Sequence, residues 1–367
     1  MDIYKKYQLK KVINASGKMT ILGVSKVRQS VFESQAYGGD HFFEMADLLE
    51  KTGDYIGDLL GAESATITSS ASAGIALSVA ALIGKGDNYH LYHPYTERIT
   101  QREIVMPKGH NVNYGTGVSV MVEQGGGKVV EAGFANECTA TQIEMEITDE
   151  TVALLYVKSH HAVQKSMLSI ESMITLAKKN GLPLIVDAAA EEDLFKYIKL
   201  GADLVIYSGA KAIEGPSSGL VVGRKEYIRW IQSQNKGLGR SMKIGKENIL
   251  GLVSAIESYL TEGSETGESM KNRLAPFVCQ LNQLNGIEAT VVQDPAGRDI
   301  FRAAIIINHT EKSAYQVAKE LKIGSLAVYT RDYQANNGRL EFDIRQVSET
   351  EMIEIINKLN DILGDGN

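Results

Sequence analysis

The 367-residue sequence has little cysteine, proline or tryptophan, with two, six and one of these residues. Cys138 and Cys279 lie far apart and do not have the spacing of metal ligands or of a disulfide framework. Neither a metal site nor a disulfide-stabilised secreted fold is therefore indicated. We expect both cysteines to be small buried hydrophobic residues in a reducing compartment.

Long hydrophobic runs and an excess of positive charge are also missing. The longest nearly apolar run, residues 71–83, is too short to cross a bilayer, and residues 1–6 lack the apolar core of a secretory signal. A formal net charge of -7 speaks against a general nucleic-acid surface. These absences predict a cytoplasmic protein without membrane or nucleic-acid partners, in which an anionic substrate would need a local group of cations.

Strand and helix signals alternate through the middle of the chain. Apolar strands are expected at 152–157, 184–187 and 204–207, with helices between them at 169–180 and 191–200. Strands separated by helices of this length imply right-handed parallel crossovers. The pattern predicts a doubly wound α/β domain with a parallel or mixed sheet.

The character of the sequence changes after a polar, glycine-containing stretch at 261–267. Beyond it the pattern is a smaller α+β one, and its last helix opens with a capping box at Ser348 and Glu351. We expect an N-terminal arm, a large α/β domain and a small C-terminal α+β domain, at residues 1–25, 26–250 and 251–367.

Three predicted strands end beside residues that could carry chemistry. Lys211 follows the strand at 204–207, where partial burial would lower the pKa of its amine and allow a Schiff base. Asp187 ends another strand. The serine-rich loop at 68–74 follows a third strand, at 65–68, and offers hydroxyls and helix N-terminal N–H groups to a phosphate. The simpler alternatives are a solvated surface lysine and ordinary helix N-caps.

Taken together, a phosphate-binding loop, a carboxylate and a lysine at three strand ends match what pyridoxal 5'-phosphate requires. The segments at 208–211 (Ser-Gly-Ala-Lys) and 215–223 resemble the fold-type I pyridoxal-phosphate enzymes, in the branch that contains bacterial selenocysteine synthase. Segments at 12–17 and 61–65 and the surroundings of Asp187 support this resemblance, which covers nearly the whole chain.

The resemblance implies roles for individual residues. Lys211 would form the aldimine, Asp187 would pair with the pyridine nitrogen, and four serines would reach the phosphate: Ser69, Ser70, Ser72 and Ser208. It also implies a homodimer, or an assembly of dimers, whose interface passes through the active site. Ser217 or Ser218 would then serve the phosphate of the neighbouring subunit.

Histidines near the predicted strand ends are further candidates. His110 is expected to stack on the cofactor, the alternative being an exposed loop histidine. His160 and His161 follow the strand at 152–157, and one of them is expected to contact cofactor or substrate. No metal is predicted, because no acidic or cysteine ligands lie at matching spacing.

An amino-acid substrate needs a cation for its carboxylate, generally an arginine that forms a bidentate pair. Arg339 is our candidate and Arg345 the reserve, the alternative being surface arginines at a strand edge. For a substrate phosphate the sequence offers, without ranking them, Lys18, Arg98, Arg102, Lys108, Arg240 and Lys243.

The resemblance implies α,β-elimination on a 2-amino sugar acid phosphate. D-glucosaminate 6-phosphate would give 2-keto-3-deoxy-6-phosphogluconate and ammonia, with Lys211 removing the C2 proton. A selenocysteine-synthase-like enzyme acting on seryl-tRNA is an alternative that the acidic balance disfavours. Another lyase or aldolase stays open, as does a cofactor-free binding protein in which Lys211 and Asp187 form a buried salt bridge.

Overall fold

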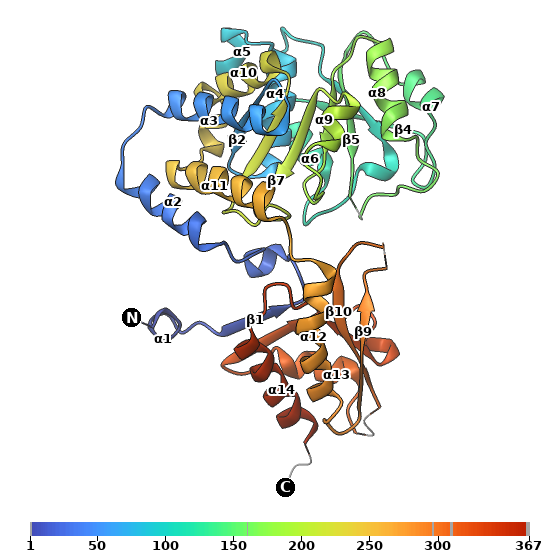
Figure 1. Cartoon of the computed structure of the whole chain (residues 1–367). Coiled ribbons are helices and arrows are strands. Elements are labelled where there is room, and N and C mark those ends of the chain that lie inside the picture. Colours follow the sequence, from blue (N-terminus) through green and yellow to red (C-terminus); the bar gives the residue numbers. More distant parts are fainter. Residues whose placement is uncertain (1, 160, 296, 309–310, 365–367) are drawn as a thin grey trace. The chain divides into compact units, whose positions relative to one another are not determined.

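A computed structural model describes residues 2–159, 161–295, 297–308 and 311–364 (Figure 1). The chain forms two compact units, one of Val27–Thr261 and one of Met1–Lys26 with Glu262–Asn367. The N-terminal arm is thus part of the smaller unit. The predicted boundary after residue 250 falls inside helix α11 (Lys246–Glu262).

The larger unit is built on a seven-stranded sheet in the order β2-β8-β7-β6-β5-β3-β4. Only β8 runs antiparallel to its neighbours, so the sheet is mixed and mainly parallel, as predicted. In chain order the strands are β2 (Ser64–Thr68), β3 (Glu103–Pro107), β4 (Lys128–Ala132), β5 (Thr151–Val157), β6 (Leu184–Asp187), β7 (Leu204–Ser208) and β8 (Gly219–Gly223).

Helices cover both faces of this sheet, because its strands carry apolar side chains on both sides. Along β7, Val205 and Tyr207 pack into one hydrophobic core, while Leu204 and Ile206 pack into the other. The first core contains residues of α3 (Met45–Leu60), α8 (Ile170–Lys179) and α11. The second contains residues of α4 (Ala71–Gly84), α6 (Val118–Gln124) and α10 (Lys225–Ser233).

One predicted helix is shorter than expected. The pattern predicted a helix over 191–200, but α9 (Lys196–Leu200) begins five residues later. The Asp193 carboxylate accepts the backbone N–H groups of Phe195 and Lys196 at 2.9 and 3.0 Å, which holds the preceding chain in a turn. The other helices of this unit are α2 (Gln29–Asp40), α5 (Asn88–Tyr92) and α7 (Ala140–Met145).

The smaller unit is α+β. An antiparallel sheet in the order β12-β10-β9 shares one core with its helices, and β1 pairs in parallel with β11. The predicted capping box is present, with the Ser348 hydroxyl accepting the N–H of Glu351 at 3.2 Å. Its elements are α1 (Ile3–Tyr7), β1 (Lys11–Ala15), α12 (Gly267–Leu281), β9 (Ile287–Gln293), β10 (Phe301–Ile307), α13 (Ala314–Leu321), β11 (Leu326–Thr330), β12 (Arg339–Phe342) and α14 (Glu349–Leu363).

Short 3-10 turns connect several of these elements, at Thr20–Leu22, Lys108–His110, Gln234–Lys236, Leu238–Met242 and Ala335–Asn337. Within the described ranges, no helix combines the length and the apolarity that a membrane span needs. Nor do the described residues include a group of three or more histidine, cysteine, aspartate or glutamate side chains placed to hold a metal ion.

Candidate active site

The predicted chemical residues gather at one edge of the large sheet. β6 ends at Asp187, β7 ends at Ser208 and β2 ends at Thr68, while Gly219 of the antiparallel β8 pairs with both Ser208 and Thr68. Lys211 follows three residues after the end of β7. In open α/β sheets, ligands bind in the crevice beyond this edge.

Asp187 is a buried carboxylate, with only 2% of its surface exposed. One of its oxygens accepts the backbone N–H of Ala189 at 3.1 Å, and the other accepts the Tyr114 hydroxyl at 3.4 Å. Burial raises the pKa of Asp187, while the Ala189 N–H, the charge of Lys211 and the Tyr114 hydroxyl act in the opposite direction. A carboxylate in such a place favours a cationic partner.

Lys211 lies in the turn after β7, where its backbone N–H donates to the Ser208 carbonyl at 3.3 Å. Its side chain is half-buried, and burial lowers the pKa of the amine, although the Asp187 carboxylate acts to raise it. The ammonium nitrogen lies 5.9 Å from the centre of the Tyr114 ring. An amine with a lowered pKa can serve as nucleophile or base near neutral pH.

The loop between Lys211 and β8 packs against the start of the turn that carries Lys211. The backbone N–H of Gly209 donates to the Ser218 carbonyl at 2.9 Å, and a Cβ on Gly209 would lie 2.1 Å from the Ser218 hydroxyl. Ser218 is buried, and its hydroxyl donates to the Pro216 carbonyl at 2.8 Å. Of the two serines predicted to serve a neighbouring phosphate, only Ser217 is exposed.

The serine loop precedes α4 and caps it. The Ser70 hydroxyl accepts the backbone N–H of Ala73 at 3.0 Å, so the N-cap alternative for Ser70 is confirmed. Ser69 is half-buried and Ser72 is exposed. Capping does not exclude an anion here, because the first turn of a helix leaves backbone N–H groups that can donate to a phosphate.

His110 is placed differently from both predictions made for it. The ring is completely buried, so it is not an exposed loop histidine. The backbone N–H of Val157 donates to Nδ1 at 3.3 Å, Nε2 donates to the Val163 carbonyl at 3.0 Å, and the ring packs edge-on against Tyr156. Burial lowers the pKa of His110 to about 4. The structure leaves no open ring face and does not support the predicted stacking or catalytic role.

Of the two paired histidines, His160 lies outside the described residues. The backbone N–H of His161 donates to the Ser159 hydroxyl at 3.2 Å. The ring of His161 meets the ring of Tyr114 at 6.1 Å between centres and an angle of 72°. His161 thus reaches the neighbourhood of Asp187 through Tyr114.

Tyr114 is the site residue that the sequence reasoning missed. It contacts Asp187, Lys211 and His161, and both burial and the Asp187 carboxylate raise the pKa of its hydroxyl. The sequence feature that could have indicated Tyr114 is an aromatic residue in a glycine-containing turn, at 113–117, shortly after strand β3. The prediction chose His110, four residues earlier.

Both arginines considered for a substrate carboxylate lie in the smaller unit and hold carboxylates there. Arg339 donates to Glu341 at 2.8 Å. Arg345 holds Asp343 with two hydrogen bonds of 2.9 and 2.8 Å, and Asp343 also lies 3.3 Å from the buried guanidinium of Arg302. A small cavity beside Arg345 is lined by Asn14, Gly17, Lys18, Asp343, Arg345 and Gln346.

In the larger unit, Arg98 is exposed and its guanidinium lies 4.1 Å from the centre of the Tyr89 ring. Arg102, by contrast, donates to four backbone carbonyls, at 2.6 to 3.0 Å. Lys108 pairs with Glu131 at 3.5 Å. Arg102 is therefore occupied in holding the loop that precedes β3.

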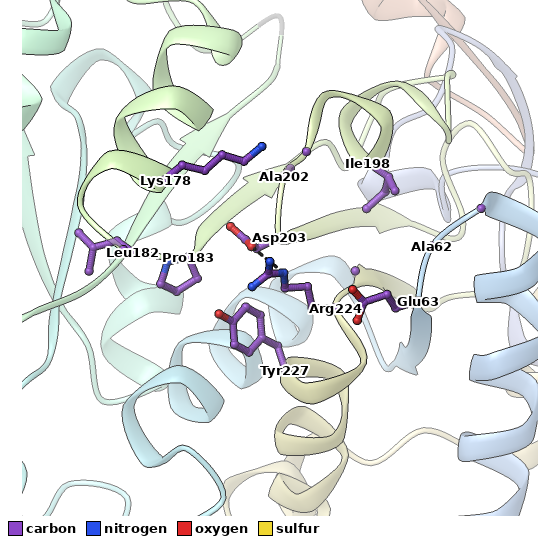
Figure 2. Close-up of a pocket in the computed structure, with 14 residues that line it drawn as sticks. Ala62, Glu63, Lys178, Leu182, Pro183, Ile198, Ala202, Asp203, Arg224 and Tyr227 are labelled. Atoms are coloured by element: carbon purple, nitrogen blue, oxygen red, sulfur yellow. Dashed lines mark ion pairs between the residues drawn. The ribbon is translucent and has the colours of Figure 1, made fainter.

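A cavity of about 490 Å³ lies at the opposite edge of the sheet, where β6 and β7 begin (Figure 2). Arg224 and Asp203 pair across it at 3.2 Å. Glu63, also on its wall, accepts the backbone N–H of Lys225 at 3.0 Å. Neither Asp187 nor Lys211 lines this cavity, so it is separate from the candidate active site.

Known proteins match this chain along its whole length. A D-glucosaminate-6-phosphate ammonia lyase from Salmonella typhimurium is 46% identical over 98% of this chain and 98% of its own. A 5'-C-glycyluridine monooxygenase-decarboxylase from a Streptomyces species is 32% identical over 96% of this chain and 90% of its own. A solved structure of D-glucosaminate-6-phosphate ammonia-lyase covers all of both chains with 44% identity and a TM-score of 0.94.

More distant solved structures, aspartate aminotransferases among them, share the fold alone, at 12–15% identity and TM-scores of 0.51 to 0.57. Together with the ammonia-lyase structure, these structures confirm the predicted fold, that of the fold-type I pyridoxal-phosphate enzymes. The family model of SelA, L-seryl-tRNA selenium transferase, matches residues 48–275, which is more than half of the chain. With this match and the full-length relatives, the chain belongs to the SelA, L-seryl-tRNA selenium transferase, family.

Proposed function

We propose that this protein is a pyridoxal-phosphate-dependent ammonia-lyase that converts D-glucosaminate 6-phosphate into 2-keto-3-deoxy-6-phosphogluconate and ammonia. The full-length likeness to the Salmonella enzyme and the matching solved structure support this assignment. The observation that carries it is the placement of Asp187 and Lys211 after two adjacent parallel strands, each acting on the charge of the other.

The described residues fit pyridoxal phosphate. Asp187 is a buried carboxylate suited to a cationic ring nitrogen, Lys211 is an amine with a lowered pKa, and the N-terminus of α4 lies at the same sheet edge. The phosphate would be held by that helix end and by Ser69, Ser70, Ser72 and Ser208. When bound, the cofactor supplies an electron sink for the negative charge that develops at C2 of the substrate.

Within this scheme, the protein's own residues hold charge and move protons. Lys211 would hold the cofactor, and its Nζ would take the C2 proton of the substrate. Burial lowers the pKa of the Lys211 amine, which favours the neutral form that a base requires. Asp187 would hold the protonated ring nitrogen. Loss of water across C2 and C3 and later addition of water at C2 leave a net release of ammonia.

For the substrate's negative groups we propose the pair Lys18 and Arg345 ahead of Arg339. Lys18 and Arg345 line the same small cavity, so two cations lie together. Arg345 and Arg302 share Asp343, and Arg302 also pairs with Asp294 at 2.9 Å. Arg345 is also held rigidly by its two bonds to Asp343, which favours directed recognition of a carboxylate or phosphate.

We further propose that the protein is a cytoplasmic homodimer. Several large apolar side chains between α2 and the first residue of α3 are exposed: Phe32, Tyr37, Phe42 and Met45, with 98% of the Phe42 surface exposed. An apolar group of this kind on a surface marks an interaction site. Sedimentation of the holoenzyme, compared with that of a Phe42→Ser variant, would show whether dimerisation depends on it.

The proposed function predicts an absorbance band at about 420 nm after addition of pyridoxal phosphate, and release of ammonia with a keto acid. The substrate panel contains 2-amino sugar acids with and without a 6-phosphate, and serine. Reactions run with and without oxygen test for chemistry like that named for the Streptomyces relative. Release of ammonia from no member of the panel would overturn the assignment.

A further inference from the structure

Arg302 is a charged side chain in the interior of the smaller unit. It lies on β10, the central strand of the three-stranded sheet, and only 1% of its surface is exposed. Its Nη2 pairs with Asp294 at 2.9 Å and its Nε pairs with Asp343 at 3.3 Å, and both carboxylates are themselves buried. The two acids directly follow β9 and β12, the strands on either side of β10. Arg302 therefore links the ends of both neighbouring strands.

Stability alone gives a poor account of these buried charges. Moving charged groups out of water is costly, and apolar side chains of similar volume often replace a buried ion pair without loss of stability. Arg302 adds a further cost, because its Nη1 is buried without a hydrogen-bond partner among the described residues. A buried network of this kind is better explained by a geometry that it fixes.

The side chain fixed at one end of this network is Arg345. The Asp343 carboxylate accepts Nε, Nη2 and the backbone N–H of Arg345 at 2.9, 2.8 and 3.3 Å, and Nε of Arg302 at 3.3 Å. These four bonds match the four lone-pair positions of a carboxylate. Burial opposes the ionisation of Asp343, but the bond to Arg345 and the charges of Arg345 and Arg302 hold its pKa below the usual value. Asp343 thus stays charged and orients Arg345.

Arg302 holds the Asp343 side chain from outside the segment that carries Arg345. Asp343 and Arg345 lie beyond the end of β12, where the chain has left the sheet. The backbone N–H of Asp343 donates to the Ala15 carbonyl at 2.8 Å, which fixes the main chain there. An arginine side chain loses much conformational entropy when it is immobilised, so a guanidinium that is oriented in advance binds an anion more tightly.

We propose that Arg302 is a positioning residue, which holds Asp343 so that Arg345 presents its guanidinium to an anionic group of the substrate. Lys18, Asp343 and Arg345 line the same small cavity. Arg302 is not part of the cavity wall, so its effect has to pass through Asp343. The proposal rests on the proposed function, in which Lys18 and Arg345 bind the negative groups of the substrate.

The test measures anion binding without turnover. The ligand is D-gluconate 6-phosphate, which carries the carboxylate and the phosphate of the proposed substrate but has a hydroxyl in place of the amine. Calorimetric titration of the holoenzyme gives the dissociation constant for the parent protein, Arg302→Lys, Arg345→Lys and the double variant. Arg298→Lys is the matched control, because Arg298 pairs with the same Asp294 carboxylate at 2.9 Å from a more exposed position. Thermal unfolding shows which variants are folded.

We expect Arg302→Lys to weaken binding by about 10-fold, because an ammonium lacks the planar fork that reaches both carboxylates. In the Arg345→Lys background the same substitution should have no further effect, since Arg302 acts through Arg345. Arg298→Lys should bind the ligand as tightly as the parent protein does. Unchanged binding in Arg302→Lys, or an equal loss in both backgrounds, would overturn the proposal.

A second variant is used if Arg302→Lys does not fold. Asp294→Asn keeps the shape of its side chain but removes the charge that anchors Arg302, so it should weaken binding in the parent protein and not in Arg345→Lys. An equal loss in both backgrounds would again overturn the proposal. Release of ammonia is measured separately. A parent protein that releases ammonia without this coupling overturns the role of Arg302 alone, whereas coupling without ammonia release overturns the proposed reaction and keeps the anion site.

Discussion

Gly219 lies against the backbone of Ser70 so closely that a Cβ on Gly219 would stand 2.3 Å from the Ser70 carbonyl carbon. Gly219 begins β8 and pairs with both Thr68 and Ser208. The serine loop and the loop that follows Lys211 are therefore brought together over a strand residue without a side chain. Any larger residue here has to push the loops apart.

Gly219→Ala should lower the free energy of unfolding by about 1–3 kcal/mol, because backbone atoms must shift to admit the methyl group. It should also weaken pyridoxal phosphate binding by moving Ser70. Gly39→Ala is the matched control, since a Cβ on Gly39 meets nothing within 4 Å and the residue lies in α2. Urea unfolding and cofactor titration measure the two effects, and equal stability of both variants would contradict the prediction.

Lys211→Met should abolish the absorbance band at about 420 nm and the covalent adduct trapped by borohydride. Turnover should fall by about 10²–10⁴-fold or more, because the variant loses both the attachment of the cofactor and the base for C2. Lys236→Met removes an exposed lysine and should leave all three signals unchanged. Substantial turnover by Lys211→Met would show that another group removes the proton.

Asp187→Asn should affect stability and function in opposite directions. Burial raises the pKa of Asp187, which means that the charged form is less favourable in the folded protein than in the unfolded chain. Removing the charge should raise the melting temperature of the cofactor-free protein, since functional sites often cost stability. Cofactor affinity should fall by about 2–5 kcal/mol, because the ring nitrogen loses its buried partner.

The control for that measurement is Asp58→Asn, at an exposed carboxylate of α3. Thermal unfolding without cofactor and titration with pyridoxal phosphate give the two quantities. A lower melting temperature in Asp187→Asn would mean that the charged carboxylate stabilises the fold through Ala189, Tyr114 and Lys211. The interpretation that the Asp187 charge lowers stability and is kept for cofactor binding would then be wrong.

The ends of the strands could be predicted from the sequence, whereas the contacts of the loops that meet there could not. The apolar runs before Asp187 and Lys211 identify strands, and their first polar residues identify the edge of the sheet. The position of His110 depends on bonds to Val157 and Val163, which lie about fifty residues away in the chain. Local patterns carry no record of such contacts, so its burial could not be predicted.

The same reason explains why Tyr114 was missed. Its contacts are with Asp187, Lys211 and His161, all in later parts of the chain. The late start of α9 has a local cause, because the Asp193 carboxylate accepts the backbone N–H groups of Phe195 and Lys196. An aspartate two or three residues before a helical pattern is a readable cap, and the prediction overlooked it.

His110 should make the folded protein sensitive to acid. Its pKa is about 4 in the folded chain and near 6.5 in the unfolded chain, so between these values the unfolded chain binds the extra proton. Stability should therefore be complete above about pH 6.5 and fall as the pH decreases toward 4, by about 3 kcal/mol in total. His110→Gln should reduce this slope in urea unfolding, whatever its effect at pH 7. His93→Gln, at an exposed histidine, should leave the slope unchanged, and an unaltered slope in His110→Gln would contradict the assignment.

Arg345 and Arg339 can be told apart by conservative substitution. Arg345→Lys keeps a positive charge but loses the planar fork that holds Asp343 with two bonds, so the group that recognises a substrate anion is no longer oriented. We expect KM for the phosphorylated amino sugar acid to rise by about 10-fold or more, with a smaller change in kcat. Arg339→Lys keeps a single-point pair with Glu341 and should change KM little. A larger rise in KM in Arg339→Lys than in Arg345→Lys would mean that Arg339 binds the substrate carboxylate, as the sequence alone predicted.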